Sequence, residues 1–131
     1  GADIIVGSGP HVLQPVEWLP TARGQTLVWF SLGNLLSTQY ELSQRLGGIA
    51  QMDVSLPDGQ LRIDGLAFYP TYMHYDWPPD GDPLGRHNLR LMPLRAASEQ
   101  LAAEHGRTVE ELWAGVESHL NQHTPVILLE P

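Results

Sequence analysis

The chain has 131 residues, which fits a single domain, and 42% of them are hydrophobic, which is enough for a folded core. Its net charge of -8, with seven arginines and no lysine, argues against nucleic-acid binding, because neutralising a phosphate backbone requires positive charge. The absence of cysteine excludes disulfide and thiolate chemistry, and no apolar run reaches the roughly 20 residues that cross a membrane. No signal peptide is visible, and the abrupt start leads us to expect a partial chain.

The first third of the chain predicts strands. Residues 2–6 contain the apolar run Ile4-Ile5-Val6, which has apolar side chains on both faces, and predict a buried strand. Residues 12–19 are extended, because Pro15 is incompatible with a central helix. A loop over 20–25 then leads to a β-rich core strand at 26–30.

The middle of the chain contains the clearest local element. One helical turn, stopped by Gly47 and Gly48, is possible at 41–46. A β-hairpin follows over 49–69, where two alternating segments flank a Pro-Asp-Gly turn. Residues 70–86 are rich in aromatic residues, proline and glycine, and predict an ordered, packed loop in which Trp77 is exposed. A further strand is expected at 87–94.

The C-terminal third predicts helices. Residues 95–105 are rich in helix formers and are followed by Gly106, which favours a helix end. Thr108 is typical of an N-cap, and an apolar face follows at Leu112, Val116 and Leu120. The apolar tail at 126–129 must pack or pair. The fold class is therefore α+β, with a mixed or mainly antiparallel sheet, a β-hairpin and C-terminal helices, in a single domain over 1–131.

Two loops that follow predicted strands carry candidate functional groups. They are Gly-Ser-Gly-Pro-His at 7–11 and Ser-Leu-Gly-Asn at 31–34. Loops at strand ends often hold the chemistry of a fold, because the rigid sheet aims them. His11 offers an imidazole for a metal or a proton, and Asn34 offers an amide that donates and accepts. The first loop is also compatible with a plain turn, so the spacing alone does not decide.

The other histidines are weaker candidates. His74, with Asp76 orienting it, could line a substrate mouth or be a packed loop residue. His105 lies at an expected helix C-terminus, where the helix dipole favours a cation. His119 and His123 are four residues apart and could bracket a metal on one helical face, although two ligands without a third are usually coincidental.

Several segments in this order resemble a known family. They read PHVLQPVEW at 10–18, FSLGNLLSTQ at 30–39 and LGGIA at 46–50, followed by MPL at 92–94. Over nearly its whole length the chain resembles the C-terminal part of the CapA family, the poly-gamma-glutamate capsule synthesis proteins. These are similar in fold to calcineurin-type metallophosphoesterases, in which two sheets form a sandwich with flanking helices. The resemblance implies that this chain supplies roughly one sheet of that sandwich.

The resemblance also implies site residues. His11 matches the last histidine of a Gly-x-His-Pro-His turn that faces a dinuclear metal centre of Mn, Zn or Fe, and Gly9 stands where the first histidine would be. His11 would thus be the metal ligand, and His11, Asn34 and His74 would be the catalytic candidates. No segment here matches the upstream metal ligands of the family. We therefore expect a partial domain without independent catalysis.

The resemblance implies a place in capsule or poly-gamma-glutamate biosynthesis, outside the cell or at its envelope, with the capsule polymer as a possible partner. The upstream half-domain, or a second copy in a homodimer, would complete the fold. An alternative is a structural or binding module, a homodimerising half-sandwich with no metal chemistry. An exposed apolar sheet face would favour this alternative, because such a face drives association.

Overall fold

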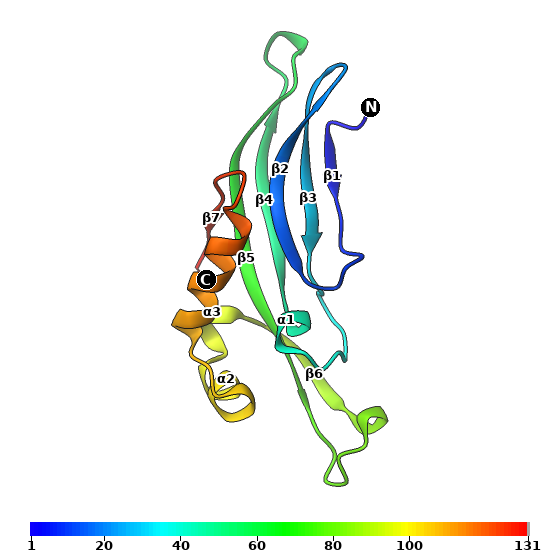
Figure 1. Cartoon of the computed structure of the whole chain (residues 1–131), viewed down its shortest axis with the longest axis vertical. Helices are drawn as coiled ribbons and strands as arrows, with labels where there is room; N and C mark the ends of the chain where they lie inside the picture. The colour runs from blue at the N-terminus through cyan, green and yellow to red at the C-terminus, as the bar shows by residue number, and fades with distance from the viewer. Residues whose placement is uncertain (131) are drawn as a thin grey trace.

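The computed structural model describes residues 1–130 and contains seven strands and three α-helices in that range. Figure 1 shows two long, twisted sheets, with the C-terminal helices on the side opposite the first strand. The strands are β1 (Ile4–Val6), β2 (Leu13–Thr21), β3 (Gly24–Leu32), β4 (Leu46–Ser55), β5 (Arg62–Asp76), β6 (His87–Pro93) and β7 (Ile127–Leu128). The helices are α1 (Leu42–Arg45), α2 (Ser98–His105) and α3 (Val109–Leu120), with short 3-10 turns at Pro57–Gly59, Pro83–Gly85 and Leu94–Ala96.

The strands form two sheets. The first has the order β1-β3-β2, with β1 parallel and β2 antiparallel to β3. The second has the order β4-β5-β6, with both neighbours antiparallel to β5 and the short β7 parallel to it. The α+β class and the mixed, mainly antiparallel pairing are confirmed. The expectation of roughly one sheet is wrong, because the strands before and after α1 form separate sheets, linked by a bridge between Gly33 and Gly47.

The two sheets and the helices share one core. Trp29 of β3 and Phe68 of β5 stack with their ring centroids 6.0 Å apart. From α3, the predicted apolar face at Leu112, Val116 and Leu120 packs into the same cluster. Burial of each large apolar side chain contributes about 1.5–3 kcal/mol to folding.

The first strands differ from the sequence-based expectation in two ways. β1 is an edge strand, and its Ile5 and Val6 are exposed rather than buried, because β1 has a neighbour on one side only. The loop expected over 20–25 is a tight turn, since β2 reaches Thr21 and β3 begins at Gly24. The positive φ of 128° at Gly24 lets the chain reverse in so few residues.

The largest correction concerns the aromatic segment. The expected loop over 70–86 begins only after Asp76, because β5 continues through the aromatic residues. Threonine and tyrosine favour strands, and every residue from Pro70 to Tyr75 is buried. The segment pairs with β4 up to Tyr72 and with β6 from Thr71 onward.

The helices follow the sequence closely. α2 ends at Gly106, which has a left-handed φ of 60°. Thr108 caps α3 in a capping box with Glu111, in which each side chain accepts a hydrogen bond from the other's backbone N–H. The predicted helical turn is α1, but Gly47 and Gly48 do not end it in a turn; they are buried in β4. Within residues 1–130, we find no helix with the length and apolar character needed to cross a membrane.

Candidate functional site

The loop after β1 and the end of β3 meet, and this contact brings His11 and Asn34 together. Parallel strands have their carboxyl ends at the same edge of a sheet, so the segments that leave β1 and β3 are neighbours. Gly33, with a φ of 71°, turns the chain from β3 toward β4. His11 is exposed and also has a positive φ, of 61°, in a turn closed by its N–H and the Ser8 carbonyl.

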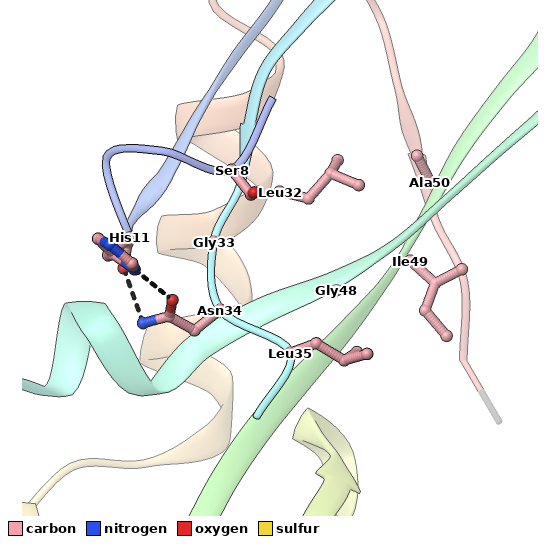
Figure 2. A pocket seen from close by; sticks show the side chains of 9 residues that line it. All are labelled: Ser8, His11, Leu32, Gly33, Asn34, Leu35, Gly48, Ile49 and Ala50. Atoms are coloured by element: carbon pink, nitrogen blue, oxygen red, sulfur yellow. Dashed lines mark hydrogen bonds between the residues drawn. The ribbon is translucent and has the colours of Figure 1, made fainter. Parts of the chain in front are cut away.

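The hydrogen bonds between His11 and Asn34 indicate which nitrogen of the neutral His11 ring carries the proton. Asn34 Nδ2 donates to the carbonyl oxygen of Gln44 at 2.8 Å and faces further acceptors on Gln39 and His11. The amide oxygen Oδ1 therefore points at His11 Nδ1, 2.8 Å away, as Figure 2 shows. Since Oδ1 is an acceptor, Nδ1 carries the proton, and Nε2 of the neutral ring keeps its lone pair.

The pair lies at the rim of a hollow of about 400 Å³. Figure 2 shows that the loop after β1, the end of β3 and the start of β4 form its walls. The walls are mainly apolar, and their polar side chains belong to Ser8, His11 and Asn34. Leu35 and Ile49, which also line the hollow, are 56% and 54% exposed. The residues that line it are Ser8, His11, Leu32, Gly33, Asn34, Leu35, Gly48, Ile49 and Ala50.

Gly47 is part of this site, although the sequence indicated it only as a helix stop. A Cβ atom on Gly47 would lie 2.1 Å from the backbone oxygen of Asn34. A Cβ atom on Gly33 would lie 2.4 Å from the carbonyl oxygen of Leu46. The crossing of these two segments therefore requires glycine on both sides, and it fixes where Asn34 lies.

His74 does not join this pair but lies in a separate, buried cluster. Its Nε2 is 2.9 Å from Asp76 Oδ1, as the sequence suggested. Its Nδ1 is 2.7 Å from Glu104 Oε1 of α2, a close approach that is not aligned as a hydrogen bond. Hydrogen bonds from Asn88 and from His74 hold the pKa of Asp76 below its usual value. His74 thus brings β5 into contact with α2, while Asp76 accepts a hydrogen bond from Asn88 of β6.

Arg45 organises this second cluster, and no pattern in the sequence indicated it. Its side chain is 2% exposed and donates to the Met73 carbonyl oxygen at 2.9 Å and to Glu104 Oε2 at 2.6 Å. Its guanidinium lies 4.8 Å from the ring centroid of Tyr72 and 4.4 Å from that of Tyr75. Arg45 therefore joins α1 to β5 and α2 with charge, hydrogen bonds and cation–π contact.

His105 was expected to be a cation because of its position at a helix end, but its contacts favour the neutral ring. Its Nε2 lies 3.2 Å from Arg45 Nη1 and 3.1 Å from the Tyr72 hydroxyl, and it can accept from such donors only in the neutral ring. Burial, followed by the Arg45 charge, lowers the pKa of His105, and the nearby Glu104 opposes the shift only in part. Burial and the Arg45 charge therefore favour the neutral ring at this helix end.

Acid is expected to destabilise the fold through His105. Because its pKa is lower in the folded state than its ordinary value of 6.5, the unfolded chain binds the proton more readily. The contribution is fully present above pH 6.5 and is lost as the pH falls toward the folded pKa. Urea denaturation at about pH 7 and about pH 5 should show a smaller pH dependence in His105→Gln than in the unchanged chain.

The exposed His87 provides the control for this measurement. His87→Gln should leave the pH dependence unchanged. Equal pH profiles for His105→Gln and the unchanged chain would contradict the assignment.

The two histidines near the end of the chain do not form a metal site. His119 Nε2 donates to the carbonyl oxygen of Leu13 at 2.9 Å, so the ring attaches the last turn of α3 to β2. Among residues 1–130, no three His, Asp or Glu side chains gather closely enough to bind a metal ion. The residues present therefore do not fit a one- or two-metal centre on their own.

The fold and site define an α+β protein with a histidine–asparagine corner at the ends of two parallel strands. A family model described as bacterial capsule synthesis protein PGA_cap matches residues 1–39, which include both His11 and Asn34. The resemblance expected over nearly the whole chain is thus found over β1 to β3 and the following loop, and assignment to the C-terminal part of that family remains a prediction. No curated protein and no solved structure gave a significant match.

Proposed function

We propose that this chain acts in capsule or poly-gamma-glutamate biosynthesis at the bacterial cell envelope, as a CapA-like module without independent catalysis. The match to the capsule synthesis family supports the first part, because it covers the strands and loops that build the His11–Asn34 corner. The lack of a three-ligand cluster in residues 1–130 supports the second part.

The observation that carries the proposal is the state of the His11 ring. A histidine that binds a metal commonly donates its other ring N–H to a carbonyl or carboxylate, which fixes the ring and its tautomer. Asn34 Oδ1 accepts that N–H here, and in the neutral ring this leaves Nε2 of the exposed His11 with its lone pair. In this proposal, His11 supplies one imidazole to a metal site, with Asn34 as its support.

The other ligands then come from beyond residues 1–130 of a single copy of the chain. A site for Mn, Zn or Fe needs several imidazole and carboxylate ligands held on rigid elements. An upstream half-domain or a second copy of the chain would bring them. When bound, such a metal would polarise a substrate oxygen or activate water.

The alternative, a homodimerising module without metal chemistry, has support from the same region. Leu35 and Leu36 next to the corner are 56% and 61% exposed, and Val6 and Ile49 are also more than half exposed. Exposed apolar groups at the rim of a hollow are typical of surfaces that associate. In this alternative, association would require neither His11 nor a metal.

Calorimetric titration with Mn²⁺ and Zn²⁺, with the mass measured in the same sample, tests the proposal. The monomer is expected to bind neither metal tightly, since it offers one imidazole. A tight site in an assembled form should be lost in His11→Ala and in His11→Gly. His11→Gly relieves the positive φ of 61° and serves as the better-folded variant.

Two outcomes would count against the proposal. Tight metal binding or phosphodiesterase activity in the monomer would contradict the lack of independent catalysis. Tight binding that His11→Ala leaves unchanged would contradict the role of His11. A dimer that binds no metal would favour the alternative.

In the bacterium that encodes the chain, deletion should lower the amount of surface polymer.

A further inference from the structure

Two exposed aromatic rings lie together outside the His11–Asn34 corner. Tyr40, in the segment before α1, is 51% exposed, and Trp77, directly after β5, is 43% exposed. Their ring centroids are 5.9 Å apart and their planes differ by 22°, so they form one aromatic surface. A folded chain has little reason to leave two large rings in water, and such a surface is typical of a binding site.

The two rings are held in place by groups behind them. The Arg86 guanidinium lies 4.4 Å from the ring centroid of Tyr40 and 5.4 Å from that of Trp77. Arg86 itself donates to backbone carbonyl oxygens of Pro83 and Thr38, one in each of the two segments. These contacts hold the two rings in place, so less ordering of side chains is needed when a ligand binds.

The buried Tyr75 supports the same arrangement. Its ring meets Trp77 edge to face, with centroids 5.7 Å apart, and its hydroxyl donates to the Gln39 carbonyl oxygen at 3.0 Å. Tyr75 thereby fixes the residue that precedes Tyr40 as well as the ring of Trp77. The tip of the β5–β6 hairpin and the segment before α1 act as one unit.

The charges around the two rings indicate whether the ligand is cationic, anionic or neutral. A free cation would be repelled by the Arg86 guanidinium, which already lies over these rings. Nucleic acid and polyglutamate are anionic, and a chain of net charge -8 without lysine repels them. A neutral sugar fits, because its polarised C–H groups match the negative faces of aromatic rings.

The surrounding loop supplies partners for sugar hydroxyls. Asp80 and Asp82 lie three and five positions after Trp77, in the exposed loop that ends at Arg86. Each uses one carboxylate oxygen to accept a backbone N–H within the loop, and this leaves its other oxygen available. A loop that carries both an aromatic ring and carboxylates can bind both the apolar face and the hydroxyl edge of a pyranose.

We propose that Tyr40 and Trp77 form a carbohydrate-binding platform on which a neutral sugar ring of a glycan chain stacks. The platform requires neither a metal nor His11, so it stands or falls separately from the proposed function. It adds a second site to this chain, at the tip of the β5–β6 hairpin shown in Figure 1.

Calorimetry and tryptophan fluorescence on the full chain test the platform, with cellohexaose, chitohexaose and poly-gamma-glutamate as probes. At least one neutral hexaose is expected to bind. Trp77→Ala and Tyr40→Ala should each weaken that binding by about tenfold, because a single stacked ring contributes on this scale. Trp77→Phe keeps a ring and should lose less. The control is Leu84→Ala, at an apolar residue of the same loop that is 92% exposed, and it should change nothing.

Three results would overturn the inference. One is the absence of binding by either hexaose up to about 10 mM. Another is hexaose binding that is the same in Trp77→Ala, Tyr40→Ala and the unchanged chain. The third is binding of poly-gamma-glutamate, rather than the hexaoses, with dependence on the same two rings. Unchanged thermal melting of the variants would show that a loss of binding is not a loss of fold.

Discussion

Replacing Arg45 by alanine should destabilise the protein by about 3 kcal/mol or more, the largest effect that we expect from a single charged residue. The change would leave the Glu104 carboxylate and the Met73 carbonyl oxygen without their donor. It would also remove the cation from between Tyr72 and Tyr75 and open a cavity among buried side chains. Urea denaturation at about pH 7 measures the loss directly.

An exposed ion pair provides the matched control. Arg62 and Asp64 are 2.5 Å apart, nearer than Arg45 and Glu104, but their side chains are 67% and 52% exposed. Exposed pairs contribute little because solvent screens them, so Arg62→Ala should cost less than about 1 kcal/mol. If Arg45→Ala and Arg62→Ala cost the same, the burial of Arg45 would have no energetic importance.

Glu104→Gln separates the charge from the packing. The glutamine keeps an oxygen that accepts from Arg45 Nη1 but removes the negative charge next to a buried cation. Its cost should lie between those of the two arginine variants. A loss as large as that of Arg45→Ala would show that the ion pair, and not the packing of the arginine, dominates the cluster.

Local signals in the sequence predicted the elements whose geometry is decided locally. The Pro-Asp-Gly turn at 57–59 and the alternation around it predicted the β4–β5 hairpin, since turn residues and side-chain period act within a few positions. The N-cap at Thr108 and the stop at Gly106 predicted the start of α3 and the end of α2 for the same reason.

Tertiary pairing decided the elements that the sequence did not predict. Residues 70–76 have the composition of a loop, and they are a strand because β4 pairs with the segment up to Tyr72 and β6 pairs with it from Thr71 to Asp76. The opposite holds for residues 2–6, whose apolar composition indicated burial although β1 has no neighbour on its outer edge. Neither pairing can be read from the segment itself.

The candidate site was predictable in part. His11 and Asn34 each follow a strand and a glycine, and this pattern indicated their loops, while the parallel pairing of β1 and β3 brought them together. The roles of Arg45 and Gly47 were not predictable, because a buried charge and a backbone crossing leave no periodic signal. The rings of Tyr40 and Trp77 likewise come together only through tertiary contact.

Gly47→Ala is expected to destabilise the fold by about 2 kcal/mol or more and to disrupt the His11–Asn34 corner at the same time. The new Cβ would lie 2.1 Å from the backbone oxygen of Asn34, which cannot yield as the end of a flexible side chain would. Asn34 must therefore shift, and its Oδ1 can no longer hold the Nδ1 proton of His11. Urea denaturation measures the first effect, and ¹⁵N chemical shifts of the His11 ring, which distinguish the tautomers, measure the second.

Gly115→Ala is the control, because it adds the same methyl group where no atom lies within 4 Å. Gly115 lies inside α3, so alanine there should stabilise the protein by about 0.5–1 kcal/mol and leave the His11 tautomer unchanged. The two glycine variants should thus have stability changes of opposite sign. A Gly47→Ala variant as stable as the unchanged chain, with the same His11 ¹⁵N shifts, would mean that the crossing at Gly33 and Gly47 does not fix the position of Asn34. The proposed support of His11 by Asn34 would then have to rest on their hydrogen bonds alone.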